Sequence, residues 1–106
     1  MAKYLIEAKY TAEGLRGLLK DKASGRRAAV SAALEGMGGK VESFYFTFGS
    51  NDVIVICDMP DNASAAALSL SVSATGLVRT RTTPLLTVEE ADAAIGKGAK
   101  YRGPGA

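Results

Sequence analysis

The sequence contains no histidine and no tryptophan, and it has a single cysteine, Cys57, among its 106 residues. Histidine is a common ligand of haem iron and zinc, and it is the usual base of serine and cysteine hydrolases. Its absence excludes these His-based sites. One cysteine excludes an intrachain disulfide, and also a thiolate site for zinc or an iron–sulfur cluster within one chain. We therefore expect no metal and no cofactor.

An excess of charge of either sign is also missing. The chain has 13 basic and 11 acidic residues, a net charge of +2. Nucleic-acid-binding domains usually carry a clustered basic patch, and the adjacent arginines Arg26 and Arg27 are too few to form one. We expect no nucleic-acid partner.

No apolar run approaches the length of about 20 residues that a membrane-spanning helix needs. The segment from Met1 to Glu7 contains no apolar stretch long enough for a secretory signal. These absences and the lone cysteine lead us to expect a soluble, cytoplasmic protein without a membrane partner.

Period-two alternation and helical spacing of apolar residues divide the chain into short strands and helices. Thr11 suits a helix N-cap, Ser24 suits the cap of a second segment after an interruption at 21–25, and Asp61 or Asn62 suits a third cap. We predict strands over 3–10, 40–48, 53–59 and 77–86, and helices over 11–20, 24–37, 63–74 and 88–95.

This order predicts an α+β fold of the ferredoxin-like type, β-α-β-β-α-β, as one domain over residues 1–95 with a tail over 96–106. The four-stranded antiparallel sheet would carry both main helices on one face. The nearly continuous apolar run 53–59 is typical of a central strand that is covered on both faces. An uncovered apolar face needs a partner, so we expect a homodimer or larger homo-oligomer.

Several short motifs together are similar to those of the GYD-domain family. They are Tyr4-Leu5-Ile6, Tyr10-Thr11-Ala12-Glu13-Gly14-Leu15, Ser24-Gly25-Arg26-Arg27, Glu42-Ser43-Phe44-Tyr45-Phe46, Phe48-Gly49, Asp52-Val53 and Leu85-Leu86-Thr87. The resemblance implies a ferredoxin-like, dimeric α/β-barrel architecture and no established activity. The Gly-Tyr-Asp element that names the family is replaced here by Gly49-Ser50-Asn51-Asp52.

The first candidate site is Ser24-Gly25-Arg26-Arg27, at a predicted helix start. Unpaired amides and the helix dipole favour an anion there, and arginine adds bidentate donors. The alternative is that Ser24 only caps the helix and that both arginines are solvated.

The second candidate is the last strand, where Arg79, Arg81 and Thr83 share one face. Glu7 and Lys9 share a face of the first strand, although the two strands need not be adjacent. These charges would form a polar pocket on the open side of the sheet, or alternatively salt bridges between subunits.

Tyr45 and Asp52 flank the hairpin turn and are the candidates for acid–base catalysis. Asp52 is alternatively a turn residue that bonds to nearby backbone. Cys57 is most simply a small buried hydrophobic residue.

Three functions fit these observations. The first is a small-molecule-binding or accessory module, with an anionic ligand paired to Arg26, Arg27 and Arg79. The second is a metal-free enzyme of the dimeric α/β-barrel type, an isomerase or a cofactor-independent oxygenase, by fold analogy alone. The third is a structural or assembly role, in which the tail acts as an arm on a neighbouring subunit, with Tyr101 and Arg102 as its anchors, or is simply a flexible end.

Overall fold

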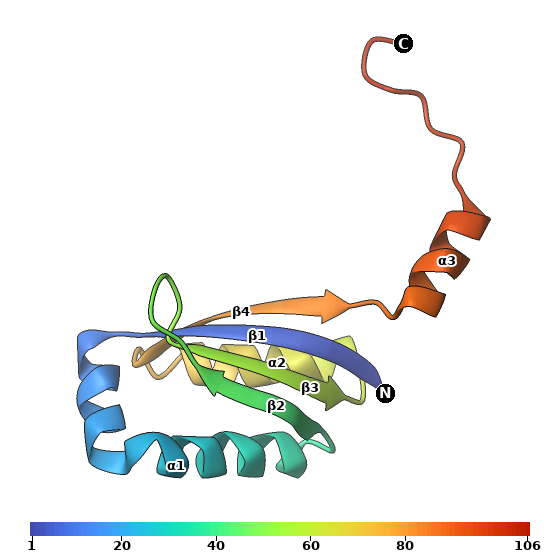
Figure 1. Cartoon of the computed structure of the whole chain (residues 1–106). Helices are drawn as coiled ribbons and strands as arrows, with labels where there is room; N and C mark the ends of the chain where they lie inside the picture. The colour runs from blue at the N-terminus through green and yellow to red at the C-terminus, as the bar shows by residue number, and fades with distance from the viewer.

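A computed structural model describes all 106 residues (Figure 1). In chain order, its elements are β1 (Ala2–Tyr10), α1 (Ala12–Gly36), β2 (Lys40–Phe46), β3 (Val53–Met59), α2 (Asn62–Ser73), β4 (Val78–Leu85) and α3 (Val88–Lys97). The β-α-β-β-α-β order is therefore confirmed, with α3 as an addition at the end.

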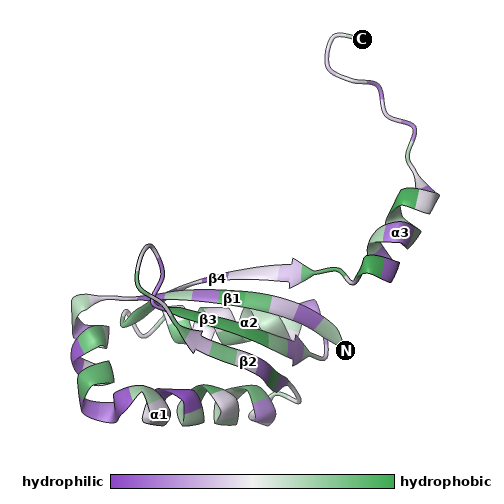
Figure 2. Ribbon diagram, viewed as in Figure 1, coloured by the Kyte–Doolittle hydropathy of each residue, from purple (hydrophilic) through white to green (hydrophobic).

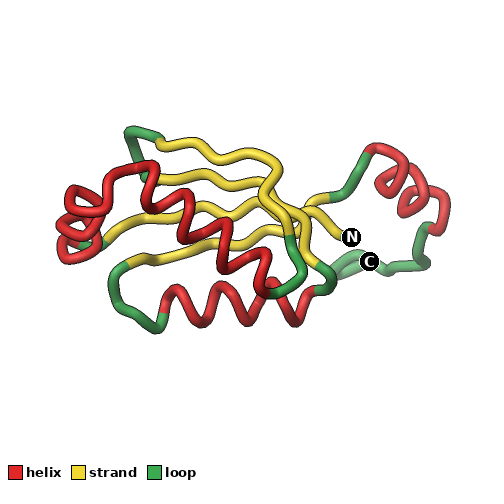
Figure 3. Tube along the Cα trace, turned by 90° about the horizontal axis from the view of Figure 1, so that it is seen from below, coloured by secondary structure: helices red, strands yellow, loops and turns green.

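The four strands form one antiparallel sheet in the order β2-β3-β1-β4. Helices α1 and α2 lie on the same face of this sheet, in front of it in the view of Figure 3. This is the predicted ferredoxin-like α+β fold. The first and last strands do turn out to be neighbours, and Glu7 lies opposite Arg81 while Lys9 lies opposite Arg79.

The core lies between the sheet and the two helices. Its strand residues alternate with less buried ones along β1 and β3, as the period-two pattern predicts. The buried set is Tyr4, Ile6, Ala8, Tyr10, Val53, Val55, Cys57 and Met59 from the strands, and Leu34, Ala65 and Leu68 from the helices. Each large aliphatic side chain fully buried here stabilises the fold by about 1.5–3 kcal/mol.

The other face of the sheet has no cover within the chain. Along β3, Val55 and Cys57 are buried under the helices, whereas Ile54, Ile56 and Asp58 point to the opposite face and are only partly buried. The prediction that this strand is covered on both faces is therefore wrong for the single chain. We call this second surface the open face. Figure 2 shows that β3 is mainly hydrophobic (green), whereas β1 carries both green and purple segments.

Two of the predicted helix caps are confirmed. The Thr11 hydroxyl accepts a hydrogen bond from the Gly14 amide at 3.2 Å, and the Asp61 carboxylate accepts one from the Ser64 amide at 2.7 Å. Each bond satisfies an amide that the first helical turn leaves without a partner.

The predicted cap at Ser24 is wrong. Helix α1 does break, but at Lys22, whose φ of 65° and ψ of 167° lie outside the helical region. Because a cap is the residue whose backbone leaves the helix, Ser24 falls inside the second segment. The break turns the chain so that the second segment runs along the sheet (Figure 1).

Helix α3 and the residues after it extend away from the body, beyond the end of β4 (Figure 1). The helix starts with a capping box in which Thr87 and Glu90 bond to each other's backbone amides. None of its residues is buried. No helix of the chain combines the length and apolar character needed to cross a membrane.

Candidate ligand cleft between the helices and the sheet

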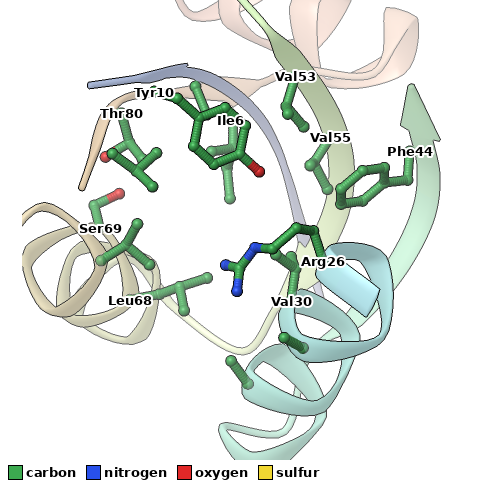
Figure 4. A pocket seen from close by; sticks show the side chains of 15 residues that line it. Ile6, Tyr10, Arg26, Val30, Phe44, Val53, Val55, Leu68, Ser69 and Thr80 are labelled. Atoms are coloured by element: carbon green, nitrogen blue, oxygen red, sulfur yellow. The ribbon is translucent and has the colours of Figure 1, made fainter. Parts of the chain in front are cut away.

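An apolar cleft lies where α1 and α2 diverge over the sheet. Its volume is about 120 Å³, and 12 of its 15 lining residues are hydrophobic. The strands contribute its floor and the helices its walls, with Val30 from α1 and Leu68 and Val72 from α2 (Figure 4). The space exists partly because small residues face it, among them Ala8, Ala29 and Ala33.

Arg26 is the one charged residue among those that line the cleft. It lies in the second segment of α1, and its guanidinium points into the space between the helices (Figure 4). The side chain keeps 29% of its accessible surface. An arginine in an apolar wall lowers its energy by pairing with an anion, because the surroundings replace water poorly.

The ion partner of Arg26 within the chain is Asp21, whose Oδ2 lies 3.6 Å from Nη1. Asp21 ends the first segment of α1 just before the break at Lys22, so the break brings the pair together. Guanidinium has five N–H donors, and one contact of this length occupies few of them. Arg26 is therefore able to bind a further anion.

A second cavity of about 320 Å³ adjoins the first at the start of α1, where Gly14, Gly17 and Leu18 line it. The two cavities share Tyr10, Arg26, Ala33, Leu68, Val72 and Val78. Arg26 is the one charged residue that lines both cavities, and its partner Asp21 also lines the second.

The serine and threonine hydroxyls that line the cleft, those of Ser69 and Thr80, are occupied in joining α2 to β4. The Ser69 hydroxyl bonds to that of Thr82, and the Ser73 hydroxyl lies 3.1 Å from that of Thr80. These pairs hold the helix on the strand. Ionic attraction in the cleft therefore comes from Arg26.

The structure separates the other predicted ligand residues from Arg26. Arg27, Ser24 and Gly25 are exposed and do not line the cleft. Arg79 and Arg81 lie exposed on the open face, because their alternate neighbours Val78 and Thr80 face the helices. The arginines of α1 and β4 thus do not form one site.

Tyr45 and Asp52 are not joined by a hydrogen bond. Asp52 Oδ2 accepts a bond from the Tyr10 amide at 2.9 Å, and its Oδ1 lies 3.4 Å from Lys9 Nζ. Tyr45 lies opposite Ile54, on the open face, with 68% of its surface exposed. Through these contacts, Asp52 holds the start of β3 to the end of β1.

Charges on the open face are only partly paired. Lys3 Nζ lies 2.9 Å from Asp58 Oδ1 and 3.2 Å from Glu42 Oε1, and the hydrogen bonds to these carboxylates raise the pKa of Lys3. Glu7 accepts a bond from the Asn51 side chain at 2.8 Å. Arg79 and Arg81 stand beside these groups with no ion pair of their own within 4 Å.

Cys57 is fully buried on β3. Burial, with a smaller contribution from the nearby Asp58 carboxylate, raises the pKa of its thiol to about 11. Nucleophilic cysteines instead have a lowered pKa and some exposure. Cys57 thus serves as a core residue, as the sequence predicts.

Arg26 could be predicted from the sequence as a ligand residue, but the apolar residues that surround it were not predicted. Ala29 and Ala33 follow Arg26 at helical spacing, and small residues on an inward stripe leave space beneath a helix. That spacing is the feature of the sequence that could have indicated a cleft.

The family model of the GYD domain matches residues 4–95, which confirms the resemblance seen in the sequence. No curated protein and no solved structure matches the chain.

Proposed function

The chain belongs to the GYD-domain family, and we propose that it binds a small molecule with an apolar body and one anionic group in the cleft between α1, α2 and the sheet. The observation that carries this proposal is the Arg26 guanidinium, which points into an otherwise apolar space (Figure 4). The anionic ligand expected from the sequence thus keeps Arg26 as its partner, without Arg27 or Arg79.

The size of the cleft limits the apolar body. A cavity of 120 Å³ is close to the roughly 150 Å³ that accommodates a benzene molecule in an engineered protein core. A single ring or a short branched chain therefore suits the first cavity. The adjoining cavity leaves room for a longer substituent.

A carboxylate is the anion that best suits this position. It accepts two parallel hydrogen bonds from a guanidinium, and such bonds strengthen where water is partly excluded. The long contact between Arg26 and Asp21 is easily rearranged, because both side chains are partly exposed.

Benzoate and its neutral analogue benzamide are suitable probes, and amide chemical shifts give their dissociation constants. We expect Arg26→Gln to weaken benzoate binding about 10-fold, the effect of one lost charged hydrogen-bond pair, and to leave benzamide binding unchanged. The matched control is Arg27→Gln, because Arg27 is the adjacent arginine and faces solvent. Equal benzoate affinity in the two variants would overturn the proposal.

A homo-oligomer is a second proposal, and it is supported by the open face. Leu5, Ile54 and Ile56 form an apolar strip across its middle, and no element of the chain covers them. An uncovered strip of this kind is typical of a surface that meets a partner. A second copy of the chain is the simplest partner, and sedimentation equilibrium measures whether it binds.

The alternative of a metal-free enzyme, an isomerase or cofactor-independent oxygenase, gains no specific support. Asp52 is engaged with Tyr10 and Lys9, and Tyr45 lies outside the cleft. The binding function is therefore the one that the geometry favours.

A further inference from the structure

The last part of the chain presents an apolar stripe that has no cover. We call residues 86–106 the arm. Val88, Ala91 and Ile95 recur at helical spacing on one side of α3, and Val88 and Ile95 keep 74% and 79% of their surface exposed. A helix of 10 residues is marginal in water by itself, so this stripe needs a surface to pack on.

The position of the arm indicates where that surface lies. In Figure 1 the arm rises on the side of the sheet opposite α1 and α2, which is the side of the open face. Figure 3, seen from the helix side, also places α3 beyond the end of the sheet. A molecule seated on the open face would therefore lie next to the stripe of α3.

Two groups of charges on the two surfaces are opposite in sign. Glu89, Glu90 and Asp92 lie in the first half of α3, whereas the exposed arginines Arg79 and Arg81 on the open face have no ion pair within the chain. In its own chain, α3 points away from the strand that carries these arginines (Figure 1). The acidic start of α3 thus suits the open face of another copy better than its own.

We propose that the arm packs against a second copy of this chain seated on the open face, with the Val88, Ala91 and Ile95 stripe toward that copy. The acidic residues Glu89 and Asp92 then lie near Arg79 and Arg81 of the second copy. This inference rests on the proposed homo-oligomer and adds to it the segment that holds the two copies together.

A matched pair of substitutions in the full-length chain tests the arm. Ala91 lies on the apolar stripe and Ala93 on the opposite side of the same helix, so Ala91→Asp and Ala93→Asp place one charge on either side. By sedimentation equilibrium, we expect Ala91→Asp to raise the dimer dissociation constant at least about 10-fold and Ala93→Asp to leave it unchanged. If the parent protein is dimeric and the two variants have equal dissociation constants, the proposed role of the arm would be wrong. The proposed homo-oligomer would still stand.

Crosslinking tests which copy the arm contacts. In an equal mixture of ¹⁴N- and ¹⁵N-labelled protein, an amine crosslinker should join Lys97 to Lys3, Lys9 or Lys40 in peptides of mixed label. Crosslinks of a single label only would show that the arm folds onto its own sheet, and the proposal would be wrong. A monomeric parent protein would contradict both the proposed role of the arm and the proposed homo-oligomer. The proposed ligand site is tested separately, by benzoate binding.

Discussion

The Asp52 carboxylate accepts a hydrogen bond from the Tyr10 backbone amide at 2.9 Å, joining the end of β1 to the residue before β3. The Asp52 amide in turn donates to the Ala8 carbonyl at 2.8 Å. Tyr10 and Ala8 both line the cleft. The hairpin residue that sequence reasoning considered for catalysis therefore also fixes one end of the proposed ligand site.

Removing the Asp52 carboxylate should destabilise the fold. We expect Asp52→Ala to lower the free energy of unfolding by about 1.5–3 kcal/mol, because it leaves the Tyr10 amide without its charged acceptor. Asp52→Asn keeps an oxygen for that amide and loses only the exposed ion pair with Lys9, so its cost should stay below about 1 kcal/mol. Urea denaturation measures both, and an equal cost for the two variants would contradict this account.

Two glycines in the first segment of α1 provide a matched test of close packing. A Cβ added at Gly14 would lie 2.0 Å from the Leu77 carbonyl oxygen, whereas one added at Gly17 would meet nothing within 4 Å. We expect Gly14→Ala to lower the free energy of unfolding by about 2–4 kcal/mol, because backbone must move. Gly17→Ala should instead raise it by about 0.5–1 kcal/mol through helix propensity. Thermal or urea unfolding of both variants provides the comparison. A Gly14→Ala protein as stable as the parent would show that the backbone near Leu77 moves aside at little cost.

The strands and most helix limits could be predicted because they depend on local patterns. The alternation of Tyr4, Ile6 and Ala8 specifies a one-sided strand, and Thr11 and Asp61 specify helix starts through bonds to amides three residues away. These features need no knowledge of distant contacts.

The site could be predicted only in part, because it depends on how distant elements meet. Arg26 and Arg27 are adjacent and chemically alike, and only the break at Lys22 and the packing of α1 turn one inward and the other outward. Serine is a common helix cap, yet the backbone leaves the helix at Lys22, two residues before Ser24. A continuous apolar run likewise could not show that Ile54 and Ile56 have no cover within the chain.

Cys57 should react with thiol reagents only when the protein opens. Its side chain is fully buried, and with a pKa of about 11 roughly one thiol in a thousand is ionised at pH 8. We expect Ellman's reagent to modify the native protein at least about 100-fold more slowly than the urea-unfolded protein. Similar rates in the two states would show that β3 opens readily to solvent.

The N-cap of α2 should make stability depend on acid pH. Hydrogen bonds from the Ser64 amide and hydroxyl lower the pKa of Asp61 below its ordinary 3.8. A carboxyl group whose pKa is lower in the folded state than in the unfolded state stabilises the fold at pH values above its unfolded-state pKa. This stabilisation is lost as the pH falls through the folded-state pKa. Urea denaturation between pH 7 and pH 2 should therefore show a loss of stability that begins near pH 4.

Asparagine also caps helices but does not titrate in this range, so Asp61→Asn should give a flatter profile with similar stability at pH 7. An unchanged slope in this variant would mean that other carboxyl groups cause the acid sensitivity.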